Sequence, residues 1–348
     1  MGHPSNEEIM QTARVNALSP WFDQQLGSAV NNGAYRQISE IVRDTDQLVR
    51  RLSDHRQAIA RSDVAIGMSG GLDSALTAAL FQAAGWTVRP LLMPIHQDAV
   101  ETDRGRMVCE ALGLPSITID LSDEYDRVSQ RLTSPSVSGE GEDAYQLRIR
   151  QGNMRARLRM ITLYDHAQAN NGVVASTDNL SELTAGFWTL HGDVGDIAPI
   201  QSYNKSWDVP KMASYMKVPK EVIYAKPTDG LGIASGDEDQ LGCSYLEWDI
   251  IMHVLLRNVM VCDHQDRTTS GKIMGGSFFD LDRIIEDLTT HASDDDKDKV
   301  NRIIGRMRAT SFKHMNPYNY DRAHNALWMS VLNAAQLLAR SLGPALPS

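Results

Sequence analysis

The sequence has few cysteines and lacks the usual metal-binding patterns. Only three cysteines occur among 348 residues, at positions 109, 243 and 262, and none forms a CxxC pair. The odd number and wide spacing argue against a disulfide framework and a zinc site, and they fit a reducing compartment. The ten histidines form no HExxH or HxxxH pair. We therefore expect neither extracellular cross-links nor a histidine-held metal.

Long apolar runs and an excess of positive charge are also missing. No apolar run is long enough to cross a bilayer, and the N-terminus, MGHPSNEEIM, has no apolar signal segment. The formal net charge of −10 argues against a surface built to hold nucleic acid, although a local basic cluster would still hold a small anion. We expect a cytoplasmic protein without membrane or nucleic-acid partners.

The order of hydrophobic patterns predicts an α/β fold. After a helical segment that ends near Arg61, short apolar runs alternate with helical periodicity. The expected strands are 63–68, 86–94, 116–121 and 172–176, and the expected helices are 72–84, 100–112, 145–168 and 179–189. Residues 128–143 are polar and rich in Gly and Ser, which predicts a loop. The acidic residues 294–298 are expected to form a solvated turn. This alternation predicts a doubly wound parallel sheet whose ligands bind at the carboxyl ends of the strands.

The chain divides into three expected parts. Residues 1–60 form an N-terminal helical segment, 61–320 the α/β domain, and 321–348 a C-terminal helix and tail. The fold class is thus a doubly wound α/β sheet with helical additions at both ends. A Gly- and Asp-rich stretch, 229–242, is the candidate lid over the site.

The strongest motif lies between the first expected strand and its helix. It comprises Gly67, Met68, Ser69, Gly70, Gly71, Leu72, Asp73 and Ser74. The two adjacent glycines allow a tight turn whose N–H groups approach an anion, and the following helix N-terminus adds positive potential. No lysine stands where a Walker A loop has one. An aspartate beside phosphates requires a divalent cation between them, which favours Mg²⁺ at Asp73.

A second block, residues 152–159 (GNMRARLR), lies in the helix expected over 145–168. At 100° per residue, Arg157 falls within the apolar face, while Arg155 and Arg159 point away and are expected to be solvated. An arginine on an apolar face needs an anionic or polar partner. That partner is either a ligand or a buried structural ion pair.

A third block, residues 176–182 (STDNLSE), follows the fourth expected strand. Glu182 has two readings. It either caps the start of the following helix or supplies a second carboxylate to the metal near Asp73.

Together these blocks resemble the NAD synthetase family of the ATP pyrophosphatase superfamily. That family shows SGGxDS, then GNxxARxR, then a GTDxxE-like turn, in the order found here. Further similar segments keep the same order: 186–189 (GFWT), 192–193, 196–199, 204–205, 226–229, 237–242 and 311–313. The resemblance extends from about residue 63 to 317, so its collinearity makes it more specific than any single motif.

The resemblance implies ATP-dependent adenylation of deamido-NAD and its amidation by ammonia, with Mg²⁺, in a homodimer. By position, Thr177, Lys205 and Thr228 join residues 67–74 as ATP contacts. Asp73 and Glu182 match metal ligands and, with Lys205, form the expected catalytic set. The expected contacts to deamido-NAD are Arg157, Asp196, Lys313 and His191. His191 is included because it lies beside a lost family lysine, although loop histidines are usually only solvated.

Four departures from the family pattern affect the expected dinucleotide contacts. Leu190 stands where the family has a lysine, the loop after it is one residue shorter, Phe312 replaces a histidine, and Ala79 replaces an arginine. The adenylation chemistry does not depend on these positions.

The nitrogen source follows from what precedes the phosphate loop. Some family members carry an N-terminal glutaminase domain with a catalytic cysteine, whereas here only about 60 residues precede the loop and none is cysteine. We therefore expect ammonia as the donor, with a separate glutaminase subunit as an alternative. The rival functions are another enzyme of the superfamily, such as a GMP synthetase or a tRNA-modifying ligase, and a catalytically silent nucleotide-binding protein.

Overall fold

Four parallel strands form the sheet at the centre of the molecule. The computed structural model describes residues 3–132, 143–225, 236–256 and 281–315. The strands are β1 (Asp63–Gly67), β2 (Thr87–Leu92), β3 (Ile117–Thr118) and β4 (Val173–Val174), in the order β3-β2-β1-β4. Val64 of β1 pairs with Val88 on one side and Val173 on the other. The strand order reverses beside β1, so ligands are expected where β1 and β4 end.

Helices cover both faces of this sheet, which confirms the doubly wound α/β fold. Strand residues point alternately to opposite faces. Accordingly Val64 and Ile66 share one buried cluster with α4 (Leu72–Ala83) and α5 (Ala99–Ala111). Ala65 belongs to a second cluster with residues of α7 (Ala144–Ala169). The two clusters are the two layers of core on either side of the sheet.

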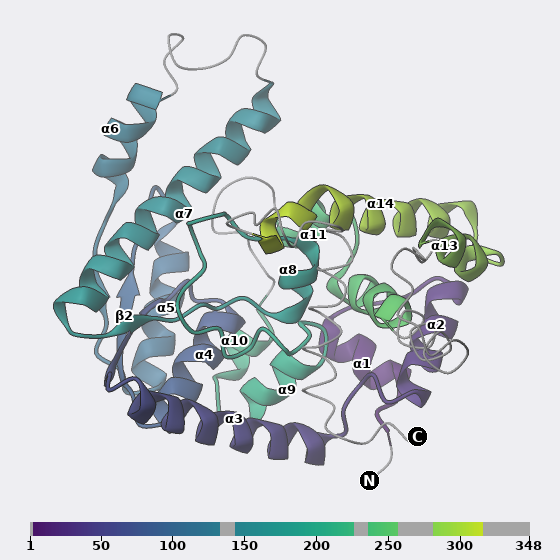
Figure 1. The fold of residues 1–348 in the computed structure, drawn as a ribbon, viewed down its shortest axis with the longest axis horizontal. Helices are drawn as coiled ribbons and strands as arrows, with labels where there is room; N and C mark the ends of the chain where they lie inside the picture. The colour runs from purple at the N-terminus through teal and green to yellow at the C-terminus, as the bar shows by residue number, and fades with distance from the viewer. Residues whose placement is uncertain (1–2, 133–142, 226–235, 257–280, 316–348) are drawn as a thin grey trace, which may run out of the picture.

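Three helices form the N-terminal segment, as the sequence predicted for residues up to Arg61. They are α1 (Asn6–Ala13), α2 (Pro20–Asn31) and α3 (Ile38–Ala58), with α3 running along the bottom of the view in Figure 1. Ile9, Phe22 and Leu26 are buried in the same core cluster as the face of the sheet that α4 covers. These helices therefore pack into the α/β core instead of forming a core of their own.

A buried ion pair joins the N-terminal segment to α9 (Asp208–Tyr215). The Arg36 guanidinium bonds to Asp208 and its Nε lies 3.3 Å from Asp44 Oδ2. Trp207 Nε1 also donates to the backbone carbonyl of Arg36 at 2.8 Å. A buried charge requires such partners, so this contact fixes where the segment docks.

Helices α6 (Ser122–Leu132) and α7 run side by side and project from one end of the molecule (Figure 1). The expectation of a loop over 128–143 is wrong for its first five residues, which belong to α6. Tyr125 is buried and Val128 packs in the cluster beneath α7, so helical spacing of these two side chains outweighs the polar composition. The rest of that stretch lies outside the described residues, apart from Asp143, which caps α7.

The remaining helices complete the site and the far end of the molecule. They are α8 (Leu180–Ala185), α10 (Lys220–Ile223), α11 (Asp237–Leu241), the helical residues 245–256, α13 (Leu281–Thr289), α14 (Asp294–Thr310) and the 3-10 turn Ser311–Met315. Helix α8 is shorter than the expected 179–189, because Gly186 adopts a left-handed conformation (φ 57°) that ends it.

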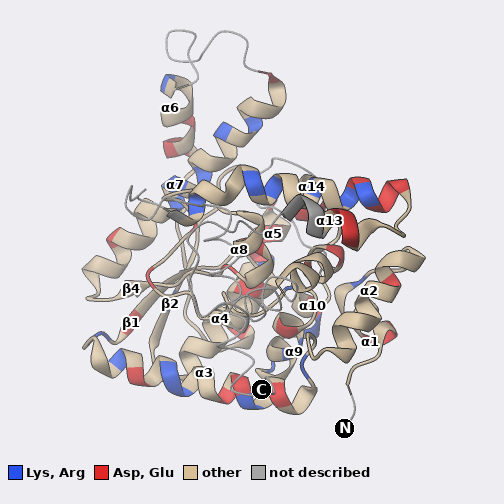
Figure 2. Ribbon diagram, turned by 45° about the vertical axis from the view of Figure 1, so that its right-hand side comes forward, with Lys and Arg blue, Asp and Glu red and all other residues tan. Residues whose placement is uncertain are grey.

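The acidic residues 294–298 are not a solvated turn. They begin α14, where Ser293 caps the helix and Asp296 is buried. Figure 2 shows acidic residues at this first turn and basic residues further along α14, an arrangement that complements the helix dipole. Within the described residues, no helix is long and apolar enough to cross a membrane. The expected C-terminal segment 321–348 lies outside those residues.

Candidate active site

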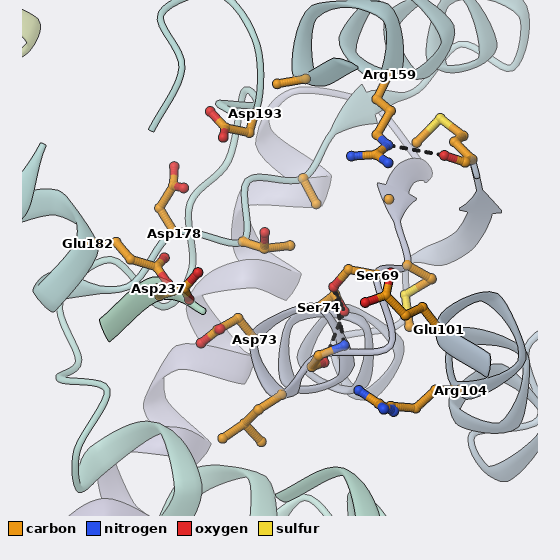
Figure 3. Close-up of a pocket in the computed structure, with 18 of the residues that line it drawn as sticks. Ser69, Asp73, Ser74, Glu101, Arg104, Arg159, Asp178, Glu182, Asp193 and Asp237 are labelled. Atoms are coloured by element: carbon orange, nitrogen blue, oxygen red, sulfur yellow. Dashed lines mark hydrogen bonds between the residues drawn. The ribbon is translucent and has the colours of Figure 1, made fainter. Parts of the chain in front are cut away.

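A cavity of about 290 Å³ opens where β1 and β4 end (Figure 3). The phosphate loop forms one wall, since every residue from 67 to 74 except Gly70 lines the cavity. Thr177, Asp178 and Glu182 from the loop after β4 and from α8 form the opposite wall, and Lys205 lies between them. The structure thus brings together the residues that the sequence assigned to ATP, apart from Thr228, which lies outside the described residues.

The phosphate loop is held by its own hydroxyl groups. Ser69 Oγ and Ser74 Oγ lie 3.1 Å apart, the Gly71 amide donates to Ser69 Oγ at 3.2 Å, and Ser74 Oγ donates to the Gly71 carbonyl at 3.0 Å. Gly71 caps α4 and supplies no side-chain acceptor, so the first amides of this 12-residue helix are available to an anion. This arrangement is suited to binding a phosphate group.

Two carboxylates from different loops share one lysine. Lys205 Nζ bonds to Asp73 and lies 3.7 Å from Glu182 Oε1, and its side chain is 9% exposed. Asn179 Nδ2 donates to Asp73 Oδ1 at 3.3 Å, which ties the loop after β4 to the phosphate loop. Burial lowers the pKa of Lys205, but the carboxylates outweigh burial and raise it overall. Lys205 is therefore a fixed cation between two acidic groups.

Glu182 satisfies both readings that the sequence left open. Its Oε2 accepts from the Asn179 amide at 3.3 Å, completing a capping box at the start of α8. Its Oε1 faces Lys205 and accepts from Tyr245 Oη at 3.5 Å. Burial raises the pKa of Glu182 well above its usual value, although Lys205 opposes that shift. The cap orients the side chain, and the second oxygen faces the cavity.

Asp73 and Glu182 fit a bound Mg²⁺ ion. They bracket one cation position, and Mg²⁺ typically takes one or two protein carboxylates together with water and phosphate oxygens. No group of three or more His, Cys, Asp or Glu side chains suited to a metal occurs in the described part of the chain. The remaining ligands would accordingly come from the nucleotide and water.

Two further carboxylates line the cavity on the side away from the phosphate loop, of which Asp178 is buried and Asp193 is exposed (Figure 3). Burial, reinforced by Asp193, raises the pKa of Asp178 to about 8. Desolvation by the surrounding protein raises the pKa of Asp193 to about 6, while the Thr189 amide, which donates to its Oδ1 at 2.8 Å, opposes the shift. The pKa values of both groups thus lie above the usual range of an aspartate.

A second, more open cavity of about 560 Å³ adjoins the first, and Asp178 lines both. Its walls include Leu190, His191 and Lys313, and Trp188 beside them. Lys313 Nζ donates to the Gly186 carbonyl at 2.7 Å and to the Trp188 carbonyl at 2.5 Å. Burial lowers the pKa of Lys313 to about 8. Two of the residues assigned to deamido-NAD, His191 and Lys313, thus face this cavity.

The other two assigned residues lie near this second cavity without lining it. Arg157 is exposed and its Nε donates to the Leu190 carbonyl at 3.2 Å. Asp196 accepts from Tyr164 Oη at 2.9 Å and from the Val174 amide at 2.9 Å, so it braces the end of β4 against α7. Asp196 therefore has a structural role irrespective of any ligand.

The expected orientation of the arginines on α7 is wrong. Arg157 is exposed, whereas Arg159 points into the first cavity and donates to the Met93 carbonyl and to Gln97 Oε1, both at 3.1 Å (Figure 3). Arg155 stacks over the Tyr125 ring at 4.5 Å. The buried residues of α7 are Gly152, Met154, Ala156 and Ala167, and Leu158 and Leu163 pack against the cluster that contains Met154 and Ala167, whereas Ile161 and Tyr164 are exposed.

The departures from the family pattern have different structural settings. Leu190 lines the second cavity beside His191, whose left-handed backbone (φ 58°) sets a tight turn. Phe312 is 55% exposed, and Ala79 is buried in the core between α4 and its neighbours. Of the three substituted positions, Leu190 therefore lies in a cavity wall, and the shorter loop after it also contributes residues to both cavities.

Several cavity residues were not identified from the sequence. They are Arg14 at the end of α1, Gln97, Glu101 and Arg104 near α5, and Asp237 of α11. Asp237 accepts from Tyr245 Oη at 3.2 Å, and it belongs to the expected lid, whose residues 237–241 form a short helix. Motif spacing could not reveal these residues because they come from segments distant in the chain.

Comparisons with known proteins agree with this site. The NAD synthase family model matches residues 44–270. An NH(3)-dependent NAD(+) synthetase of Alkaliphilus oremlandii is 34% identical over 207 residues, which are 59% of this chain and 82% of that protein. The structure of NMN synthetase from Francisella tularensis is similar, with 27% identity, a TM-score of 0.58, and coverage of 77% of this chain and 94% of that one.

A further solved structure shows the same fold. The NH3-dependent NAD synthetase from Campylobacter jejuni has a TM-score of 0.53 at 23% identity, over 78% of this chain and 95% of that one. The family match includes the phosphate loop, Glu182 and Lys205. The resemblance found in the sequence is thus confirmed, and the chain belongs to the NAD synthase family, a family of ligases that form a carbon–nitrogen bond.

Proposed function

We propose that this protein adenylates the nicotinate carboxylate of deamido-NAD with ATP and lets ammonia displace AMP to give NAD. The main support for this proposal is that the two cavities adjoin each other and share Asp178 in their walls. One holds a phosphate loop and the other opens toward solvent with room for a nucleotide. A carboxylate from the second cavity would meet the α-phosphate of ATP at their junction.

In the first step the nicotinate carboxylate attacks the α-phosphate, and the bond to the β-phosphate breaks. Pyrophosphate leaves with its charge spread over the loop amides at the start of α4 and over Lys205. Such preorganised donors lower the barrier because they need no rearrangement as charge develops. Mg²⁺ held by Asp73 and Glu182 would neutralise further charge on the leaving group.

In the second step nitrogen attacks the acyl carbon, a C–N bond forms and the bond to AMP breaks. Ammonium must lose a proton before it attacks. Asp193 and Asp178 line the first cavity and have raised pKa values, about 6 and about 8, which suit proton transfer near neutrality. We assign the proton-accepting role to Asp193, whose pKa is the lower of the two.

We further propose that ammonia is the donor and that the active form is a homodimer. The relatives named above include ammonia-dependent enzymes. Ile161 and Tyr164 on α7 and Val194 beside the second cavity are exposed, at 59%, 37% and 37%. A second copy covering these apolar side chains would enclose a dinucleotide in the open cavity.

Purified protein with Mg²⁺-ATP and deamido-NAD tests the function directly. We expect NAD, AMP and pyrophosphate in equal amounts with ammonium, and no NAD with glutamine. Omission of Mg²⁺, or Asp73→Asn, should abolish pyrophosphate release. Absence of pyrophosphate release with either donor contradicts the proposal, and XMP then tests the GMP synthetase alternative.

Nicotinate mononucleotide is a second candidate substrate. The likeness to the Francisella NMN synthetase favours it, and Leu190 stands in the second cavity where the family has a lysine. The ratio of kcat/KM for the dinucleotide and the mononucleotide decides between them. We expect the dinucleotide to be preferred because the second cavity exceeds what a mononucleotide needs.

A further inference from the structure

An arginine from the N-terminal segment reaches the nucleotide cavity. Arg14 follows the last residue of α1 and lines the cavity together with Leu72 and Asp73 of the phosphate loop. It lies outside residues 44–270, the part of the chain that matches the family model. Its position therefore comes from how the added helices pack, not from the shared motifs.

The backbone around Arg14 is fixed in a specific conformation. Arg14 has a left-handed backbone (φ 61°) and its amide donates to the Gln11 and Met10 carbonyls, which ends α1. Helix α1 is held in turn by Ile9, which is fully buried, and by Asn6 Nδ2, which donates to Asp23 Oδ1 at 3.0 Å. The direction in which Arg14 leaves the helix is thus determined by packing.

The side chain is oriented at its far end as well. One guanidinium nitrogen, Nη1, donates to the carbonyl of Ala225, which follows α10 and also lines the cavity. Partial burial lowers the pKa of this guanidinium, and the nearby carboxylates of Glu238 and Asp73 oppose that shift. A guanidinium carries five N–H donors in a planar fork, so a contact through Nη1 is compatible with simultaneous bonding to phosphate.

The acidic lining of the cavity requires a cation such as Arg14 if a polyphosphate is to bind there. Carboxylates dominate its lining: Asp73, Glu101, Asp178, Glu182, Asp193 and Asp237. Lys205 bonds to two of them and Arg159 bonds to Met93 and Gln97, while Arg14 and Arg104 are further cations in the cavity wall. A triphosphate carries several negative charges. Its entry into an acidic cavity therefore costs electrostatic free energy unless cations at the mouth offset the repulsion.

We propose that Arg14 is a nucleotide-binding residue that contacts the β- and γ-phosphates of ATP, so that the N-terminal helices form part of the ATP site. The β- and γ-phosphates are assigned because Arg14 is close enough to Asp73, in the phosphate loop at the start of α4, to interact with it electrostatically. The inference rests on the proposed use of ATP in this cavity. It predicts that Arg14 also contacts the pyrophosphate product.

Three variants distinguish the effect of the positive charge of Arg14 from a purely structural role of its side chain. Arg14→Gln keeps a donor for the Ala225 carbonyl and removes the charge, Arg14→Lys keeps the charge and removes the fork, and Arg50→Ala removes an exposed arginine of α3 that does not line the cavity. We expect Arg14→Gln to raise the KM for ATP by roughly ten-fold, the effect of one charge-assisted hydrogen bond. Arg14→Lys should recover part of this loss, and Arg50→Ala should match the wild type.

Product inhibition identifies which phosphates are contacted. In Arg14→Gln the inhibition constant of pyrophosphate should rise about as much as the KM for ATP, roughly ten-fold, whereas that of AMP should change less than two-fold. The KM for deamido-NAD and the melting temperature should stay near their wild-type values. Isothermal titration of the wild type and Arg14→Gln with pyrophosphate alone measures the same contact without turnover.

Two results would overturn the inference. One is an active Arg14→Gln enzyme with unchanged KM for ATP and unchanged pyrophosphate binding. The other is a parallel rise of both substrate KM values with a lower melting temperature, which would make Arg14 a structural contact only. If the wild type released no pyrophosphate from ATP, the proposed function would be wrong. The titration with pyrophosphate would still show whether Arg14 contacts phosphate.

Discussion

Gly70 and Gly105 lie in direct backbone contact, and this contact positions the phosphate loop. A Cβ on Gly70 would lie 2.8 Å from the Gly105 amide nitrogen, and Gly70 has a left-handed backbone (φ 78°). A Cβ on Gly105 would lie 2.9 Å from the Met68 carbonyl oxygen and 2.5 Å from Leu92 Cδ2. Helix α5 therefore supports the loop from behind, and only glycine fits at either position.

Gly105→Ala should impair both stability and nucleotide binding. The added methyl group has to displace the loop or Leu92, so we expect the free energy of unfolding to fall by about 1–3 kcal/mol. The KM for ATP should rise more than that for deamido-NAD. Denaturant unfolding and steady-state kinetics measure these effects. Gly305→Ala is the matched control, because nothing lies within 4 Å of a Cβ there, and this substitution within α14 should stabilise by about 0.5–1 kcal/mol.

Lys205→Met should reduce catalysis and destabilise the fold. The substitution leaves Asp73 and Glu182 buried without their shared cation. Loss of one transition-state contact typically lowers kcat by about 100- to 1000-fold. Breaking a buried ion pair by removing one partner costs about 3–5 kcal/mol at pH 7. Lys205→Arg retains the charge and should keep most of the stability, so equal stability of the Met variant and the wild type would contradict this role.

The rate with ammonium should depend on the ionisation of Asp193. Desolvation by the surrounding protein raises its pKa to about 6, so the carboxylate that accepts a proton is present above pH 6 and lost below it. We expect kcat to fall as the pH drops through 6. Asp193→Asn keeps an oxygen for the Thr189 amide and should lower kcat by about 100-fold or more while flattening the acid limb. If Asp193→Asn retained the wild-type pH profile, a group other than Asp193 would accept the proton.

Binding of the dinucleotide should weaken at alkaline pH. Burial lowers the pKa of Lys313 to about 8, so its positive charge is present below pH 8 and lost above it. If this charge meets a substrate phosphate, the KM for deamido-NAD rises through that range. Lys313→Gln should raise this KM at pH 7 by roughly ten-fold and remove the pH dependence. Lys217→Gln, at an exposed turn, should behave as the wild type.

Local signals in the sequence predicted the elements that build the catalytic edge. Strand β1, the phosphate loop and helix α4 appear in consecutive residues, because the apolar run, the adjacent glycines and the helical periodicity each act over a few positions. Glu182 was identified in the same way, as an acid near a helix start after a strand. Its double role, capping α8 and facing Lys205, became visible only from the position of α8.

The arginines of α7 show where periodicity fails. Counting apolar residues placed Arg157 on the buried face, yet Arg159 is the one that enters the cavity. Helix α7 packs on the sheet side through Met154 and Ala167, with Leu158 and Leu163 beside them. Ile161 and Tyr164 are apolar but exposed, so counting them shifted the expected face toward the wrong side of the helix.

The sequence by itself determined the fold class and the family and predicted a phosphate-binding loop, because these depend on short-range patterns whose order along the chain is preserved. Tertiary structure decided which distant residues share the cavity. It brought Arg14 of α1, Arg104 of α5 and Asp237 of α11 to one site, and it placed Asp178 at the junction of two cavities. Those positions follow from the packing of helices on the sheet, which depends on the summed shape of many side chains and therefore leaves no local motif.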